Sequence, residues 1–115
     1  MAIDLRNVDI DELAKKHHAI YKGIYRYHPV RKEVIERSKA LVAFLLENPI
    51  RGKITIDEVD FLAGGQFCIT LDDNWGSDLD ILVETNSRII ISNGVHHESF
   101  EDPGKLHEIR KKFDF

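Results

Sequence analysis

Hydrophobic side chains recur at three- and four-residue steps in the first half of the chain. Leu13, Ile20 and Ile24 lie on one stripe, and Asp9 with Glu12 has the spacing of a capping box. We predict a first helix that begins at Asp9 or Asp11 and runs to about Tyr27. Pro29 ends it, because the residue before a proline disfavours helical angles.

A second helix is predicted from about Val30 or Arg31 to Glu47. Its apolar stripe consists of Val34, Ile35, Leu41, Val42, Leu45 and Leu46. The Asn48-Pro49 pair ends this helix. The two helices follow each other so closely that we expect an antiparallel helical hairpin.

The pattern changes to strict alternation in the second half, which is typical of half-buried strands. Strands are predicted at Gln66–Leu71, Leu79–Glu84 and Ile89–Ser92, with turns at 72–77 and 86–87. Residues 54–64 fit either a strand or a short helix, and we favour a strand over Asp57–Ala63 that turns back through Gly64-Gly65.

Beyond Gly94 the sequence predicts an irregular piece from Val95 to Glu101. Asp102-Pro103 then begins a short helix, with Asp as the N-cap and Leu106, Ile109 and Phe113 facing the core. The expected fold is therefore a single α+β domain over residues 1–115. An N-terminal helical hairpin packs on an antiparallel meander of three or four strands, and a short helix ends the chain.

Charge is divided unevenly along the chain. Residues 1–53 contain eleven Lys or Arg and seven Asp or Glu, whereas residues 54–115 contain five and thirteen. The halves therefore carry +4 and −8, and the whole chain −4. The two halves can neutralise each other where they pack, or they can present faces of opposite sign to partners.

Several kinds of chemistry have little support. A single cysteine excludes an internal disulfide and a multi-cysteine metal site. The six histidines lack a known ligand spacing, and no nucleophile elbow or phosphate loop occurs. We expect no cofactor, no metal site and no catalytic residue. The N-terminal residues show no signal-peptide pattern and no membrane-length apolar run occurs, so the expected location is cytoplasmic without a membrane partner.

Acidic residues of the second half are the main candidates for a binding surface. By period-two counting, Asp78, Asp80 and Glu84 share the polar face of the sheet, which Asp57 and Asp60 can join. The acidic turn adds further partner-binding candidates: Asp72, Asp73 and the only tryptophan, Trp75. Alternatively, these charges bind no partner and only prevent the open sheet from aggregating.

We expect a non-enzymatic protein-binding domain of the inhibitor, immunity or assembly type, which uses an acidic sheet face to hold a basic partner. One alternative is a ligand-binding or enzymatic domain with a pocket between helices and sheet, lined by His17, Tyr21, His28 and Cys68. Another is nucleic-acid contact through the basic helical pair, which the acidic pI of about 5.8 disfavours. A homodimer is a further possibility, because the oppositely charged halves of two copies can pair with each other.

Overall fold

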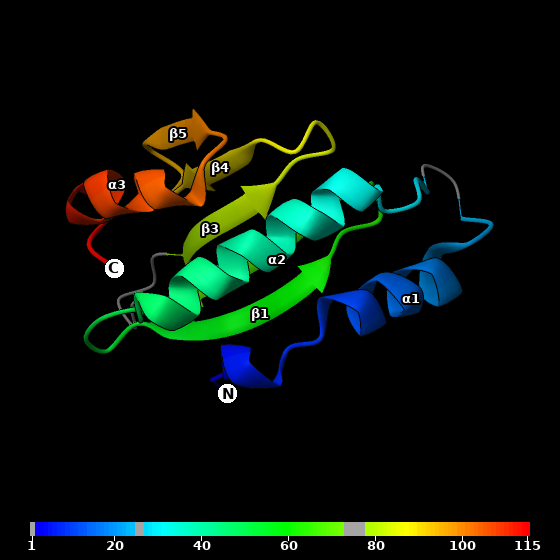
Figure 1. The fold of residues 1–115 in the computed structure, drawn as a ribbon, viewed down its shortest axis with the longest axis horizontal. Coiled ribbons are helices and arrows are strands. Elements are labelled where there is room, and N and C mark those ends of the chain that lie inside the picture. Colours follow the sequence, from blue (N-terminus) through cyan, green and yellow to red (C-terminus); the bar gives the residue numbers. More distant parts are fainter. Residues whose placement is uncertain (1, 25–26, 73–77) are drawn as a thin grey trace.

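Three helices and five strands make up the computed structural model, which describes residues 2–24, 27–72 and 78–115 (Figure 1). The helices are α1 (Ile10–Tyr21), α2 (Lys32–Glu47) and α3 (Leu106–Phe113). The strands are β1 (Thr55–Phe61), β2 (Phe67–Asp72), β3 (Asp78–Val83), β4 (Ile89–Ser92) and β5 (His97–Phe100). The predicted α+β class and order of elements are confirmed, but the sheet has five strands rather than the three or four that we expected.

The sheet is an antiparallel meander whose spatial order, β1-β2-β3-β4-β5, is the order along the chain. The favoured strand interpretation of residues 54–64 is confirmed, although β1 begins and ends two residues earlier than predicted. The prediction of an irregular Val95–Glu101 segment was wrong, because His97–Phe100 pairs with β4. Three of the four residues of β5 are polar, so its sequence carries no apolar alternation, and the strand is held by its backbone pairing.

The helices pack on one face of this sheet. Alternate strand residues, among them Ile69, Ile81 and Ile91, are fully buried and belong to the same apolar cluster as Leu41 of α2 and Leu106 of α3. Figure 1 shows α2 lying over the sheet, roughly aligned with β1 and β3, with α1 beside β1 and α3 near β4 and β5. Both layers therefore enclose a single cluster of buried side chains, and none of the described helices lies on the other face of the sheet.

Helix α1 begins as predicted and ends early. The Asp9 side chain accepts a hydrogen bond from the Glu12 amide at 3.2 Å, which satisfies one of the free N–H groups of the first turn. The helix ends at Tyr21 rather than at Tyr27, because Gly23 takes a left-handed conformation with φ +86°. Helix α2 then runs in the opposite direction to α1 (Figure 1).

A buried histidine fixes α1 to the sheet. His17 is 2% exposed, and its Nε2 lies 2.6 Å from the backbone oxygen of Leu62, at the end of β1. Because a carbonyl oxygen only accepts, Nε2 carries the proton in this contact. Its ring also packs against Tyr21, Tyr27 and Phe61. This polar anchor explains a histidine on the apolar stripe of the helix.

Helix α3 follows a one-turn 3-10 helix, Pro103–Lys105, whose predicted cap is confirmed. The Asp102 side chain accepts from the Gly104 amide at 2.9 Å, and Pro103 occupies the first turn, where no N–H is needed. Leu106 and Phe113 are buried in the core, as expected from their spacing, and Ile109 packs against it. Across the described ranges, no helix has both the length and the apolar character that a bilayer crossing requires.

The turn between β1 and β2 gives a matched test of this packing. Gly65 has φ +90°, and a Cβ there would lie 3.3 Å from the backbone oxygens of His28 and Pro29. At Gly64 a Cβ would meet only the flexible Gln66 side chain. We expect Gly65→Ala to lower the free energy of unfolding by about 1–2 kcal/mol or more. Gly64→Ala should change it by less than about 1 kcal/mol.

Urea denaturation followed by circular dichroism measures both variants. Equal losses of unfolding free energy in the two variants would contradict the assigned turn geometry.

Candidate functional site: the acidic face of the sheet

The face of the sheet that the helices leave uncovered is here called the open face. Its residues lie in rows across the strands, as the pairing register requires. The first row is Thr55, Asp72 and Asp78; the second is Glu58, Thr70, Asp80, Ser92 and His97; the third is Asp60, Cys68, Leu82, Ile90 and Ser99. Carboxylates thus gather over β1, β2 and β3.

Carboxylates on the open face stand close to one another. Asp72 and Asp78 are direct partners across β2 and β3, and Asp80 is the partner of Thr70. Like charges directly opposite each other in a sheet are destabilising. The Thr70 hydroxyl donates to Asp80 Oδ1 at 3.0 Å, which orients that carboxylate. The fold therefore tolerates a repulsive arrangement in which at least one carboxylate is held in a fixed position.

Cations of the open face lie at its other end. Arg88, which precedes β4, donates through Nε to Ser99 Oγ at 2.8 Å and through Nη1 to Glu101 Oε1 at 3.3 Å. Within the described ranges, Glu58 and Asp78 form no ion pair with any Lys or Arg, and both are exposed. The negative charges of Glu58 and Asp78 are consequently not neutralised by a described Lys or Arg side chain.

The structure brings together part of the predicted partner-binding set. Asp72, Asp78 and Asp80 share the open face. Glu84 continues the alternation of Asp78, Asp80 and Leu82, but it lies just beyond the end of β3. Trp75 and Asp73 lie outside the described residues.

One acidic residue of the face was missed in the sequence. The register shifts between Ile56 and Glu58, so Asp57 is an extra residue at a bulge. This bulge places Glu58 and Asp60 on the open face, instead of Asp57 and Asp60 as expected. The phase slip between the apolar pairs Ile54–Ile56 and Val59–Phe61 is the signal from which the bulge could have been inferred.

The four residues proposed for a ligand pocket do not form one site. His17 and Tyr21 are neighbours, with ring centroids 5.0 Å apart, but the space around His17 is filled by Tyr27 and Phe61. The side chain of His28 is exposed, while its amide donates to Ala63 O at 3.2 Å. Cys68 lies on the open face, opposite to the helices. The described residues therefore show no shared cavity for this set.

Metal and nucleic-acid chemistry gain little from the arrangement. Among the residues that the structure describes, no three His, Cys, Asp or Glu side chains converge as metal ligands would. Lys15 pairs with Glu12 at 3.5 Å, and Lys39 pairs with Asp11 at 2.8 Å. These helical cations thus have acidic neighbours, which reduces the positive field of the helix pair.

Cys68 reports the electrostatic field of the open face. Burial raises the pKa of its thiol above the usual value, and the nearby carboxylates Asp80, Glu58 and Asp60 raise it further. The Thr70 hydroxyl, with its Oγ1 3.6 Å from Sγ, acts in the opposite direction. A thiol in this environment is mostly protonated at neutral pH, so it is a poor nucleophile.

No known protein family, curated protein or solved structure was found to match this chain. Its function is therefore argued from the chemistry of its own surface.

The thiol of Cys68 gives the prediction of this section. Because the thiolate is the reactive species, folded protein should react with neutral iodoacetamide at pH 8 at least about tenfold more slowly than urea-unfolded protein. Glu58→Lys should accelerate the folded-state reaction several-fold, because it replaces a carboxylate that raises the thiol pKa with a cation.

The control variant is Glu36→Lys, which makes the same charge change on the exposed side of α2. It should leave the alkylation rate nearly unchanged. A Glu58→Lys protein that reacts no faster than the control would refute the electrostatic effect. Mass spectrometry of quenched samples gives the rates.

Proposed function

We propose that this protein is a non-enzymatic binding domain whose open face holds the basic surface of a protein partner, as an inhibitor or assembly protein does. The observation that carries the proposal is the gathering of carboxylates over β1–β3, of which Glu58 and Asp78 are exposed and form no ion pair with a described Lys or Arg. A folded protein loses stability by placing like charges opposite each other, and a cationic partner would relieve that repulsion.

The shape of the site fits a macromolecule better than a small molecule. A sheet face without a covering helix is broad, and the described carboxylates are spread over three strands. Small ligands are usually enclosed in concave pockets that remove most of their surface from water. The open face offers charges in rows and little enclosure, as expected for contact with a protein surface.

An apolar row beside the carboxylates supports the same conclusion. Cys68, Leu82 and Ile90 are adjacent on β2, β3 and β4, and the last two are partly exposed. Protein interfaces combine an apolar centre with a polar rim. A partner with cationic side chains next to an apolar strip would therefore contact both rows, and burial of the apolar row would add affinity that salt does not weaken.

The partner chemistry is tested with deca-lysine as a probe of the cationic binding site. In a titration of ¹⁵N-labelled protein, the amide signals of β1–β3, including Glu58, Thr70 and Asp80, should shift and saturate. Affinity should fall as salt rises, because surface charges are screened beyond about 8 Å at physiological ionic strength. The double variant Glu58→Lys with Asp78→Lys should weaken binding about tenfold or more.

The single substitution Glu36→Lys again serves as the control. It should weaken binding much less than Glu58→Lys or Asp78→Lys, each introduced alone. The proposal fails if the shifted amides lie on the helices. It also fails if reversal on α2 weakens binding as strongly as reversal on the sheet.

A further inference from the structure

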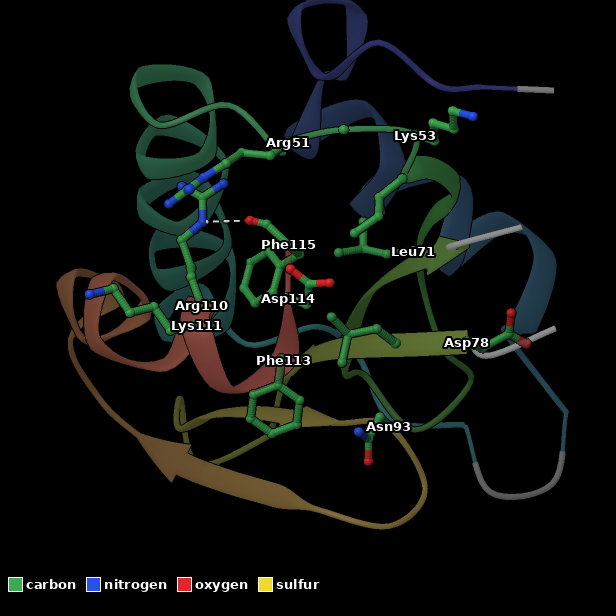
Figure 2. A pocket seen from close by; sticks show the side chains of 13 residues that line it. Arg51, Lys53, Leu71, Asp78, Asn93, Arg110, Lys111, Phe113, Asp114 and Phe115 are labelled. Carbon is green, nitrogen blue, oxygen red and sulfur yellow. Dashed lines mark hydrogen bonds between the residues drawn. The ribbon is translucent and has the colours of Figure 1, made fainter. Parts of the chain in front are cut away.

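A second charged site lies at one end of the sheet, next to the first carboxylate row, with which it shares Asp78. It is a hollow of about 570 Å³ between the loop that follows α2, the C-terminal end of α3 and the ends of the central strands (Figure 2). Its described lining includes four cations, Arg51, Lys53, Arg110 and Lys111, and two carboxylates, Asp78 and Asp114. In a chain of net charge −4, this is a local excess of positive charge.

Arg110 is a buried cation at this hollow. It is 6% exposed, and three of its nitrogen atoms donate to backbone oxygens. Nε donates to Phe115 at 2.9 Å, Nη1 to Asn48 at 2.9 Å and Nη2 to Pro49 at 2.6 Å. These contacts join α3 to the end of α2. Among the described side chains, no carboxylate pairs with Arg110, although buried charges are usually paired.

A second guanidinium group lies next to the first. Figure 2 shows the end of Arg51 beside that of Arg110, while Lys53 and Lys111 extend away from them. Burial lowers the pKa of Arg110, and the positive charge of Arg51 lowers it further. Arg51 is exposed and has no ion pair with a described carboxylate. Two adjacent cations repel each other unless an anion lies between them.

We propose that this hollow binds the phosphoryl group of a small phosphorylated molecule between Arg51 and Arg110. Each terminal nitrogen of Arg110 has two N–H bonds, and the backbone contacts use one on each. The remaining N–H groups and the whole guanidinium of Arg51 are donors for an oxyanion. Planar guanidinium groups match the tetrahedral oxygens of phosphate in paired hydrogen bonds, and a doubly charged anion offsets both cations.

The hollow is larger than a phosphate ion, so it has room for the organic part of such a ligand. Its lining also includes the apolar side chains of Leu71, Leu79 and Phe113, which would contact that part. Apart from Asp78, which also belongs to the first carboxylate row, the lining of this site lies outside the rows of the open face. Phosphate binding between Arg51 and Arg110 therefore does not depend on whether the open face binds a basic protein.

Inorganic phosphate is the probe for this proposal. It is titrated into ¹⁵N-labelled protein at constant ionic strength, with sodium chloride replaced as phosphate is added, while the Arg Nε–H signals are followed. We expect the signals of Arg51 and Arg110 to shift saturably, with a dissociation constant of about 1 mM or lower. Phosphate should also raise the melting temperature, since a ligand that binds only the folded state stabilises it.

Arg51→Gln should weaken phosphate binding about tenfold and remove most of the thermal stabilisation. Because Arg51 is exposed, this variant should fold normally, which the unliganded spectrum verifies. The control is Lys112→Gln, which removes the same charge from an exposed position of α3 whose side chain pairs with Glu98 at 2.8 Å. Its affinity for phosphate should be unchanged. Absence of saturable shifts, or equal weakening in both variants, would overturn the proposal.

Discussion

The cost of removing carboxylates from water is the constraint on which this structure depends. Glu58, Asp60, Asp72, Asp78 and Asp80 alternate along the strands with the side chains that form the core. Burying an unpaired carboxylate costs several kcal/mol, so only the apolar face of the sheet can accept the helices. The helices accordingly lie on one side, and the acidic side stays in contact with water.

This one-sided packing converts the uneven charge of the sequence into a difference between two layers. Helices α1 and α2 each contain as many Lys and Arg as Asp and Glu, and α3 has a net charge of +2, whereas the five strands contain seven carboxylates and no Lys or Arg. Some charges neutralise each other locally, as Lys39 does with Asp11. Glu58 and Asp78 form no ion pair with a described Lys or Arg, and the adjacent guanidinium groups of Arg51 and Arg110 form none with a described carboxylate side chain. Both proposals concern charges that the fold leaves uncompensated.

Periodicity was sufficient to predict the class, the order of elements and the face of Asp78 and Asp80, because alternation and helical spacing are local properties. It failed where tertiary contacts decide. Strand β5 is fixed by its pairing with β4. The bulge at Asp57 places Glu58, instead of Asp57, on the open face. The site at Arg110 depends on its contacts with Asn48 and Pro49, which precede it in the chain by 62 and 61 positions. No local sequence pattern encodes such distant contacts.

Solvent accessibility of neighbouring methyl groups tests the central arrangement most directly. Leu82 and Ile90 lie on the open face, while the adjacent Ile81 and Ile91 are fully buried beneath the helices. A neutral gadolinium chelate in solution should strongly relax the methyl signals of Leu82 and Ile90 and leave those of Ile81 and Ile91 nearly unaffected. Equal relaxation within each pair, or stronger relaxation of Ile81 and Ile91, would contradict a sheet that is covered on one side only.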